Sequence, residues 1–295
     1  MAQDEVQADT ALSPLDSSGA GDRDPVWRWT DIGAAPEFGA IGVWRSGSLT
    51  WAAYGRVLRD PDFVRSLQVS CYLAVLGTGL SLGLGLGLAL LLRSAGRWAT
   101  FMCQMTLPIP HLVGVSGILL LLSPSGLLSR VAYTLQWTGS DQDFPLLVND
   151  VGYLGVLIHM LWKEVPFAAL ILLAVLRGMG SDYEMQSRLL GSNRWQSFWY
   201  VTLPLLRPGL LSAGVLIFGF IFGSFEVPLL LGPTYPRALP VQVYQLFSHP
   251  NLARRQEAMA LGILMAVISI SLVGILVGTG WQRQPRQTSG QVRDL

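Results

Sequence analysis

Five long apolar runs divide the chain, at about 67–92, 99–122, 151–176, 210–232 and 258–280. Each approaches the roughly 20 apolar residues that an α-helix needs to cross about 30 Å of hydrocarbon. The pattern therefore predicts an all-α membrane protein with about five transmembrane helices. An odd number of crossings would place the two ends of the chain on opposite sides of the membrane.

Two of these runs carry signals beyond their length. In the first run, Gly79, Gly83 and Gly87 recur at intervals of four, which places them on one helical face and predicts close packing against another helix. In the second run, Pro108 and Pro110 lie near the start. Since proline removes a helical hydrogen bond and clashes with the preceding turn, we expect that helix to be bent or broken there.

The segments that flank the apolar runs suggest a simple division of the chain. Residues 1–62 contain no spanning run and begin with an acidic, small-residue composition, so we expect a disordered to irregular segment on the extracytoplasmic side. Residues 63–280 would form the transmembrane domain and 281–295 a cytoplasmic tail. This orientation follows from the density of arginine in the short loops on one side.

Composition places the chain among membrane proteins and narrows its possible partners. Hydrophobic residues make up 51% and charged residues 13%, against roughly 25% charged in soluble domains. A net charge of +1 gives no reason to expect nucleic acid as a partner. The cysteines and His111, His159 and His249 do not cluster at metal-ligand spacing, and no hydrolase or metalloprotease motif occurs. We therefore expect neither a metal site nor an enzyme.

A polar segment, residues 182–209, separates the third and fourth apolar runs and contains "EMQSRLLGSNRWQSFWYVTLPLLRPG". Its first half has helix-forming character, with Gly191 as a hinge, and Pro204 and Pro208 are expected to end the helix. A short helix, a glycine turn and a proline-fixed return would form a protrusion suited to a groove on a partner. An amphipathic helix lying on lipid explains the same composition.

The spacing within this segment resembles that of a known family. Gly191, nine residues, Val201, one residue, then Leu203 and Pro204 resembles the cytoplasmic coupling loop of binding-protein-dependent ABC importer permeases. That family's pattern is Glu-Ala-Ala, three residues, Gly, nine residues, Ile, one residue, Leu-Pro. The resemblance spans about 54–280 and includes "WKEVPFAALILLAVLRGM" before the loop and "FGSFEVPLLLGPTYPRALPVQVYQLF" after it.

The resemblance implies a type I ABC importer permease fold in the bacterial plasma (inner) membrane, with a cytoplasmic coupling helix. Two departures stand out. Met185, Gln186 and Ser187 occupy the Glu-Ala-Ala positions, so Glu184 would have to substitute for the family glutamate that contacts the ATPase. The first helix of the usual six is also missing, which leaves five. The coupling residues implied by the resemblance are Glu184, Met185, Arg188, Leu189, Leu190, Gly191, Trp195, Leu203 and Pro204.

The only lysine in the chain, Lys163, lies in "LWKEV", so the chain has no P-loop, which requires a Gly-Lys-Ser/Thr sequence. ATP and its magnesium ion are therefore expected on a partner, and no cofactor on this chain. The resemblance implies that cytoplasmic ABC ATPase subunits, a second permease subunit and an extracytoplasmic solute-binding protein assemble with it in the membrane lipid.

Polar residues inside the apolar runs are candidates for the translocation pathway, because burying them in hydrocarbon is costly. This set comprises His159, Lys163, Glu164, Glu226 and Pro228. An ion pair between helices explains the first three equally, and helix packing explains the last two. A carboxylate near the outer end suits a small cation such as a polyamine. An ion-coupled secondary transporter and a non-transporting membrane scaffold remain alternatives to the importer.

Overall fold

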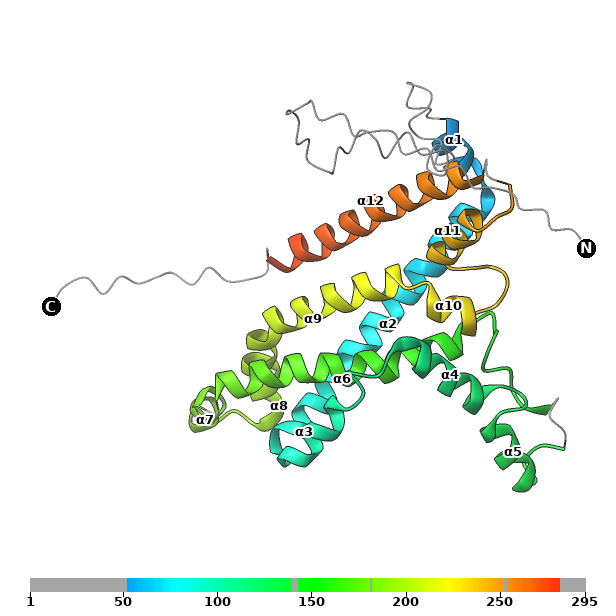
Figure 1. Cartoon of the computed structure of the whole chain (residues 1–295). Helices are drawn as coiled ribbons and strands as arrows, with labels where there is room; N and C mark the ends of the chain where they lie inside the picture. Colours follow the sequence, from blue (N-terminus) through cyan, green and yellow to red (C-terminus); the bar gives the residue numbers. More distant parts are fainter. Residues whose placement is uncertain (1–51, 140–142, 181, 252–253, 282–295) are drawn as a thin grey trace, which may run out of the picture. The chain divides into compact units, whose positions relative to one another are not determined.

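A computed structural model describes residues 52–139, 143–180, 182–251 and 254–281. Every regular element in these ranges is a helix (Figure 1), which confirms the all-α prediction. Most of the expected N-terminal segment 1–62 and the tail 281–295 lie outside the described residues. The elements are α1 Ala52–Arg59, α2 Pro61–Ser94, α3 Arg97–Gln104, α4 His111–Leu122, α5 Leu127–Thr134, α6 Leu154–Met179, α7 Asp182–Leu189, α8 Arg194–Ser197, the π-helix η2 Phe198–Thr202, α9 Leu203–Gly223, α10 Glu226–Leu231, α11 Leu239–Phe247 and α12 Arg254–Trp281.

Among the described residues, five helical stretches are long and apolar enough to cross a membrane, as the apolar runs predicted. Two of these stretches differ most from the predicted limits. The second is His111–Thr134 rather than 99–122, and the fourth is Arg194–Gly223 rather than 210–232. The irregular N-terminal segment was also predicted to extend too far, because α1 and the first residues of α2 fall inside 1–62.

The core forms where α2, α6 and α9 pack against one another (Figure 1). Small residues of α2 allow this approach. A Cβ atom on Gly85 would lie 2.6 Å from the Cβ of Ala168 on α6, and one on Gly77 would lie 2.8 Å from the Cδ1 of Ile221 on α9. Gly85 requires glycine, because the backbone of α6 also lies within 3.2 Å of that position. At Gly77 only the end of the Ile221 side chain would have to move.

The prediction that Gly79, Gly83 and Gly87 pack against another helix is wrong within this chain. All three are exposed, and a Cβ atom at any of them would meet nothing within 4 Å. The contact face lies beside it on the same helix, where Ser81 and Ala89 join the two packed glycines and are fully buried. Glycine permits close approach but does not select the neighbour, so two adjacent faces of small residues cannot be told apart by spacing alone.

The second apolar run is broken at its prolines, as predicted. Helix α3 ends at Gln104, and α4 begins at His111, with Pro110 as its N-cap residue. Both residues that precede a proline in this interval are disfavoured in the helical conformation. The interruption leaves the carbonyl groups of the intervening turn without helical partners.

The expectation that Pro204 and Pro208 end a helix is wrong. Helix α8, the π-helix η2 and α9 follow without interruption, and Pro208 lies inside α9. In the π-turn, the N–H of Leu203 donates to the carbonyl of Phe198, five residues earlier. This wider turn replaces the regular hydrogen-bonding pattern immediately before Pro204, a residue that has no N–H to donate.

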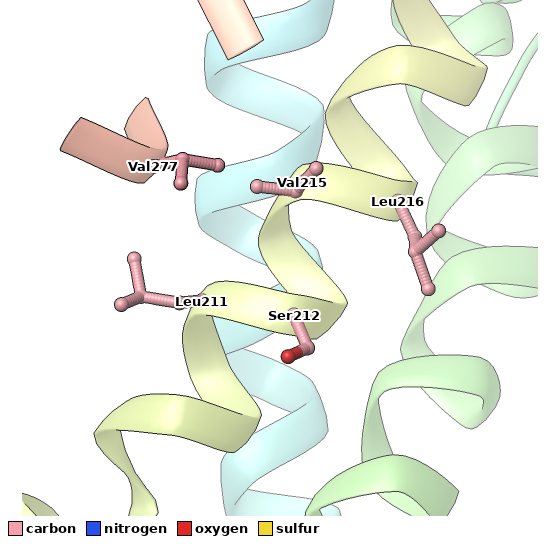
Figure 2. Close-up of a pocket in the computed structure, with 5 residues that line it drawn as sticks. All are labelled: Leu211, Ser212, Val215, Leu216 and Val277. Carbon is pink, nitrogen blue, oxygen red and sulfur yellow. The ribbon is translucent and has the colours of Figure 1, made fainter. Parts of the chain in front are cut away.

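Helix α12 packs against α9, α11 and α1. Arg56 of α1 and Glu257 of α12 form an ion pair at 2.8 Å. Toward the other end of α12, a hollow of about 320 Å³ separates it from α9 and is lined by Leu211, Ser212, Val215, Leu216 and Val277 (Figure 2). The lining carries no charged side chain, and the one hydroxyl in it already donates to the carbonyl of Pro208 at 3.0 Å. We therefore do not assign solute recognition to this hollow.

Candidate functional site

The segment 182–209 forms α7, a turn, α8, η2 and the start of α9, with α7 at one end of the molecule (Figure 1). Helix α7 ends in a turn in which Gly191 has a φ angle of +90° and donates its N–H to the carbonyl of Arg188 at 2.9 Å. Only glycine adopts this conformation without strain. Helix α8 then starts with a capping box, in which Asn193 and Gln196 exchange side-chain to backbone hydrogen bonds. The hinge predicted at Gly191 is therefore a defined turn.

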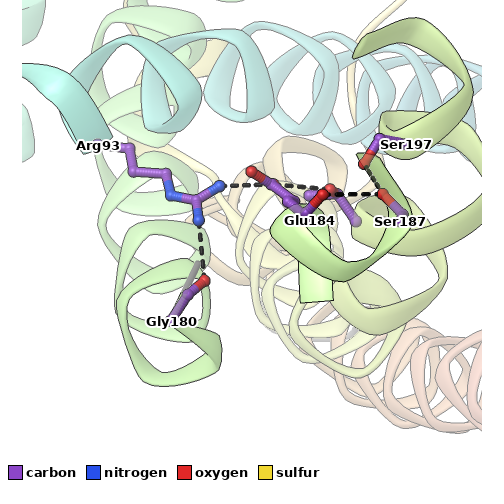
Figure 3. Close-up of polar contacts among 6 residues, drawn as sticks. Arg93, Gly180, Glu184, Ser187 and Ser197 are labelled. Carbon is purple, nitrogen blue, oxygen red and sulfur yellow. Dashed lines mark hydrogen bonds and ion pairs between the residues drawn. The ribbon is translucent and has the colours of Figure 1, made fainter. Parts of the chain in front are cut away.

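Glu184 points toward Arg93 at the end of α2 (Figure 3). Its Oε1 atom accepts a hydrogen bond from Nη1 of Arg93 at 2.6 Å and another from the hydroxyl of Thr202 at 2.8 Å. The second terminal nitrogen of Arg93 donates to the carbonyl of Gly180 at 2.9 Å. One carboxylate thus joins α7 to the last turn of α2 and to η2.

The electrostatic environment keeps Glu184 ionised. Its partial burial acts to raise the pKa of the carboxyl group. The hydrogen bonds from Arg93 and Thr202 and the charges of Arg93 and Arg188 outweigh that effect and lower the pKa below its usual value. Both side chains of the Arg93–Glu184 pair are about one-quarter exposed, so solvent screens this pair less than a surface ion pair.

A second contact joins α7 to α8 on their inner sides. The hydroxyl groups of Ser187 on α7 and Ser197 on α8 lie 2.6 Å apart (Figure 3), and Ser197 is buried. Ser187 occupies one of the positions where the family pattern has alanine. Neither this contact nor the roles of Arg93 and Thr202 was expected. The position of Arg93 directly after the first apolar run was the one signal available in the sequence.

The opposite side of the same segment presents apolar side chains to the exterior. Leu189 is 81% exposed, Leu190 89% and Trp195 68%, and Met185 is also exposed. Arg188 is exposed beside them, whereas Leu203 and Pro204 are half-buried at the base. Of the predicted coupling residues, the structure therefore gathers five at the tip and turns Glu184 inward. We call Met185, Arg188, Leu189, Leu190 and Trp195 the docking tip.

The second group of predicted residues lies on α6. His159, Lys163 and Glu164 are all buried there. The Lys163 ammonium group donates to the carbonyls of Thr106 and Leu107, each at 2.9 Å, and to that of Ile109 at 2.5 Å. These are the carbonyls released by the break between α3 and α4. Lys163 therefore supplies hydrogen-bond donors to the carbonyls of the broken turn.

His159 faces a second histidine across the packed helices α4 and α6. Its Nε2 atom lies 3.4 Å from Nδ1 of His111, and its Nδ1 atom is buried without a hydrogen-bond partner in the described residues. A Cβ atom on Gly114 would lie 2.7 Å from Cε1 of His159, so glycine is needed for this approach. The ring of Phe220 stacks near His111 at 4.8 Å between centroids.

Glu226 and Pro228 were expected within the fourth spanning helix, but they lie outside it. Helix α9 ends at Gly223, and Glu226 starts the short helix α10, in which Pro228 is buried. The chain therefore leaves the helix between Gly223 and Glu226, before it reaches Pro228. Helix α10 packs against α4 and α6, so these two residues belong to the same end of the protein as the start of α4.

The chain matches a family model described as "Binding-protein-dependent transport system inner membrane component" over residues 79–284. It is 26% identical over 234 residues to the sulfate transport system permease protein CysT of Escherichia coli, covering 78% of this chain and 80% of that protein. It is 28% identical over 228 residues to the molybdenum transport system permease protein ModB of Mycobacterium tuberculosis, covering 76% and 82%. With the thiamine transport system permease protein ThiP of Escherichia coli, it shares 31% identity over 186 residues, which cover 61% of this chain and 32% of ThiP.

The fold is also similar to that of a solved structure. A chain of a bacterial ABC transporter involved in the import of the acidic polysaccharide alginate superimposes with a TM-score of 0.69. The sequence identity is 20%, and the match covers 87% of this chain and 92% of that one. The same transporter in complex with its alginate pentasaccharide-bound periplasmic protein gives a TM-score of 0.67.

Proposed function

The chain belongs to the binding-protein-dependent transport system inner membrane components, and from this membership we propose that it works through the docking tip. It is a permease subunit of an ABC importer in the inner membrane. In our proposal it forms half of the solute pathway and couples to a cytoplasmic ATPase through the segment 182–209. The observation that carries this proposal is the exposed apolar tip held on a polar, internally bonded base.

The docking tip has the chemistry of a helix that enters a groove on another protein. Exposed leucine and tryptophan side chains grouped on one surface mark a binding site rather than a solvated loop. The Gly191 turn sets the angle between α7 and α8, and the Ser187–Ser197 contact holds the two helices together. The partner that hydrolyses ATP with magnesium would accept this tip.

The base of the segment supplies a route by which movement of the tip reaches the membrane. Glu184 is bonded to Arg93 at the end of α2 and to Thr202 in the turn before α9. A displacement of α7 would therefore move the ends of two spanning helices. This replaces the expectation that Glu184 contacts an arginine of the ATPase, because its carboxylate is already used within the chain. We assign it a positioning role.

The pathway candidates on α6 divide into different roles. Lys163 is fully used by three carbonyl groups, which supports a structural role and leaves no donor for a solute. The His111–His159 pair, with one free buried nitrogen, is the better candidate for contact with the pathway. Glu226 alone favours a small cation such as a polyamine. The relatives named above carry sulfate, molybdenum and thiamine, so family membership does not choose among these solutes.

Reconstitution tests the proposal directly. The chain, with the second permease, the ATPase and the solute-binding protein that we propose as its partners, is placed in proteoliposomes, and solute uptake is measured with ATP and with an ion gradient alone. Uptake that requires ATP and is lost in Leu189→Asp/Leu190→Asp supports the importer and the tip. Uptake driven by the gradient alone indicates a secondary transporter. Binding of the ATPase without uptake of any solute indicates a scaffold.

A further inference from the structure

An open hollow of about 700 Å³ lies at the same end of the molecule as the docking tip. It is formed by α3 and the last turn of α6, and no role assigned above involves it. The side chains that line it are Arg97, Trp98, Thr100, Phe101, Gln104 and Arg177. Two guanidinium groups, a hydroxyl, an amide and two aromatic rings thus share one site.

The positive charge of this hollow is not neutralised within the described part of the chain. Arg93, one turn before α3, is paired with Glu184. By contrast, neither Arg97 nor Arg177 forms an ion pair with a carboxylate in the ranges that the structure describes. Arg177 donates instead to the hydroxyl oxygen of Thr100 at 3.3 Å. This contact holds the guanidinium at the wall of the hollow and leaves the Thr100 hydroxyl proton free to donate.

The hollow lies at the ends of two helices that are long and apolar enough to cross the membrane. Arg97 follows the end of α2 by three residues, and Arg177 lies in the last turn of α6, and both helices are membrane spans. Trp98 is 78% exposed, and its ring meets that of Phe101 edge-on at 6.0 Å. Exposed aromatic side chains of this kind concentrate at the membrane–water interface, where their apolar body and polar edge are both satisfied.

We propose that this hollow binds a phosphate group and that its source in the membrane is the headgroup of an anionic phospholipid. Guanidinium groups bind phosphate oxygens through paired, charge-assisted hydrogen bonds, and the Thr100 hydroxyl and Gln104 amide supply further donors. Trp98 and Phe101 contact the glycerol and upper acyl region. A bound lipid would connect α3 to α6. This site lies close in sequence to Arg93, the residue at the end of α2 that binds Glu184. The proposal does not depend on which solute or ATPase the chain serves.

Native mass spectrometry of the purified protein tests lipid selectivity. The probes are dioleoyl phosphatidylglycerol, dioleoyl phosphatidylcholine and inorganic phosphate, each added to delipidated protein in detergent. We expect retained phosphatidylglycerol and little phosphatidylcholine. We also expect about a fivefold weaker affinity for phosphatidylglycerol for each arginine replaced in Arg97→Gln and Arg177→Gln. Arg207→Gln removes an exposed arginine at the start of α9, outside the hollow, and serves as the matched control.

The outcomes distinguish a lipid headgroup from free phosphate as the ligand. They also distinguish loss of the binding site from unfolding of a variant. Equal retention of both lipids by the unaltered protein overturns the proposal, and so does an Arg97→Gln/Arg177→Gln variant that binds phosphatidylglycerol as the control does. Binding of inorganic phosphate without preference for phosphatidylglycerol overturns the lipid as the source. If the double variant unfolds, the test uses quenching of tryptophan fluorescence by brominated phosphatidylglycerol instead. The unaltered protein should be quenched more than Trp98→Phe, and equal quenching overturns the site.

Discussion

Two regions of this protein carry a pair of prolines near the start of a membrane span, and the pairs have opposite effects. At Pro108 and Pro110 the helix is broken between α3 and α4. At Pro204 and Pro208 the chain stays helical from Arg194 to Gly223. The comparison shows that the number of prolines does not decide the outcome. Their spacing, and the groups available to bind the freed carbonyls, decide it.

Spacing explains the first difference. With prolines two residues apart, Leu107 and Ile109 both precede a proline and are both disfavoured in the helical conformation. With prolines four residues apart, the two missing N–H groups lie on the same side of the helix. Pro204 then lies next to a π-turn that already has a different hydrogen-bonding pattern, and the N–H missing from Pro208 would have bonded to Pro204 itself.

The second difference is what replaces the lost hydrogen bonds. The break between α3 and α4 leaves three carbonyls in a half-buried turn without helical partners, and the Lys163 ammonium group binds all of them. Such groups are costly without a partner. The continuous helix at Pro204 needs no donor from elsewhere in the chain. The first region therefore depends on a distant residue, and the second depends mainly on its own sequence.

The largest expected effect follows from removing that distant residue. Lys163→Met should destabilise the protein by roughly 3 kcal/mol, because three half-buried carbonyls lose their donor at about 1 kcal/mol each, the low end of the range for an unsatisfied group. Thermal unfolding in detergent measures it. Lys163→Arg keeps the charge and donors and should recover part of the stability. An unchanged unfolding temperature in Lys163→Met would show that the broken turn does not rely on lysine.

A proline added to the second region should act on function more than on stability. Gly191→Pro is incompatible with the φ angle of +90° and removes the N–H that bonds to Arg188. We expect ATP hydrolysis to continue in the assembled importer while uptake falls at least tenfold. ATPase activity and uptake are measured on one preparation. Gly191→Ala, which costs about 1–2 kcal/mol in this conformation, is the control, and full uptake by Gly191→Pro would refute the coupling role.

An intermediate effect is expected at the base of the second region. Glu184→Gln should cost about 1–2 kcal/mol, since it replaces a charge-assisted bond to Arg93, and should lower uptake per ATP hydrolysed. The exchange Arg93→Glu/Glu184→Arg should restore part of both, which a loss caused only by side-chain size would not. Met185→Glu should not compensate for Glu184→Gln, because Met185 is exposed at the docking tip and Arg93 is bonded on the inner side of α7.

The same pair gives a pH dependence of defined sign. The folded-state pKa of Glu184 is lowered from the model-peptide value of 4.5. Its contribution to stability is therefore fully present above pH 4.5, and it is lost as the pH falls through the lower folded-state pKa. The difference in unfolding temperature between the unaltered protein and Glu184→Gln should shrink over that acidic range. A difference that stays constant would contradict the ion pair.

The smallest effect is expected at Pro204 itself. Pro204→Ala should change stability by no more than about 1 kcal/mol, because the π-turn already accommodates the missing N–H. Thermal unfolding again measures it, and Pro208→Ala provides a second proline in the same helix for comparison. A loss above about 2 kcal/mol would mean that proline, rather than the turn, holds the base of the segment.

Several features could be predicted from the sequence because they depend on neighbouring residues. Five apolar runs of spanning length predicted five candidate membrane helices, since helix formation and lipid burial depend on local composition. The sequence predicted a hinge at Gly191, and Gly191 lies in a turn with a positive φ angle. The exposed leucines and Trp195 of the docking tip were also anticipated by their polar surroundings.

Contacts between distant residues could not be predicted in this way. The sequence listed Glu184 and Lys163 as functional candidates, but only the tertiary structure paired Glu184 with Arg93, 91 residues away, and Lys163 with carbonyls 54 to 57 residues away. It also decided that Gly77 and Gly85, not Gly79 and Gly83, meet other helices. Apolar length and turn chemistry act along a few residues of chain. The partner of a buried charge, or of a small residue, is chosen by which helices pack together.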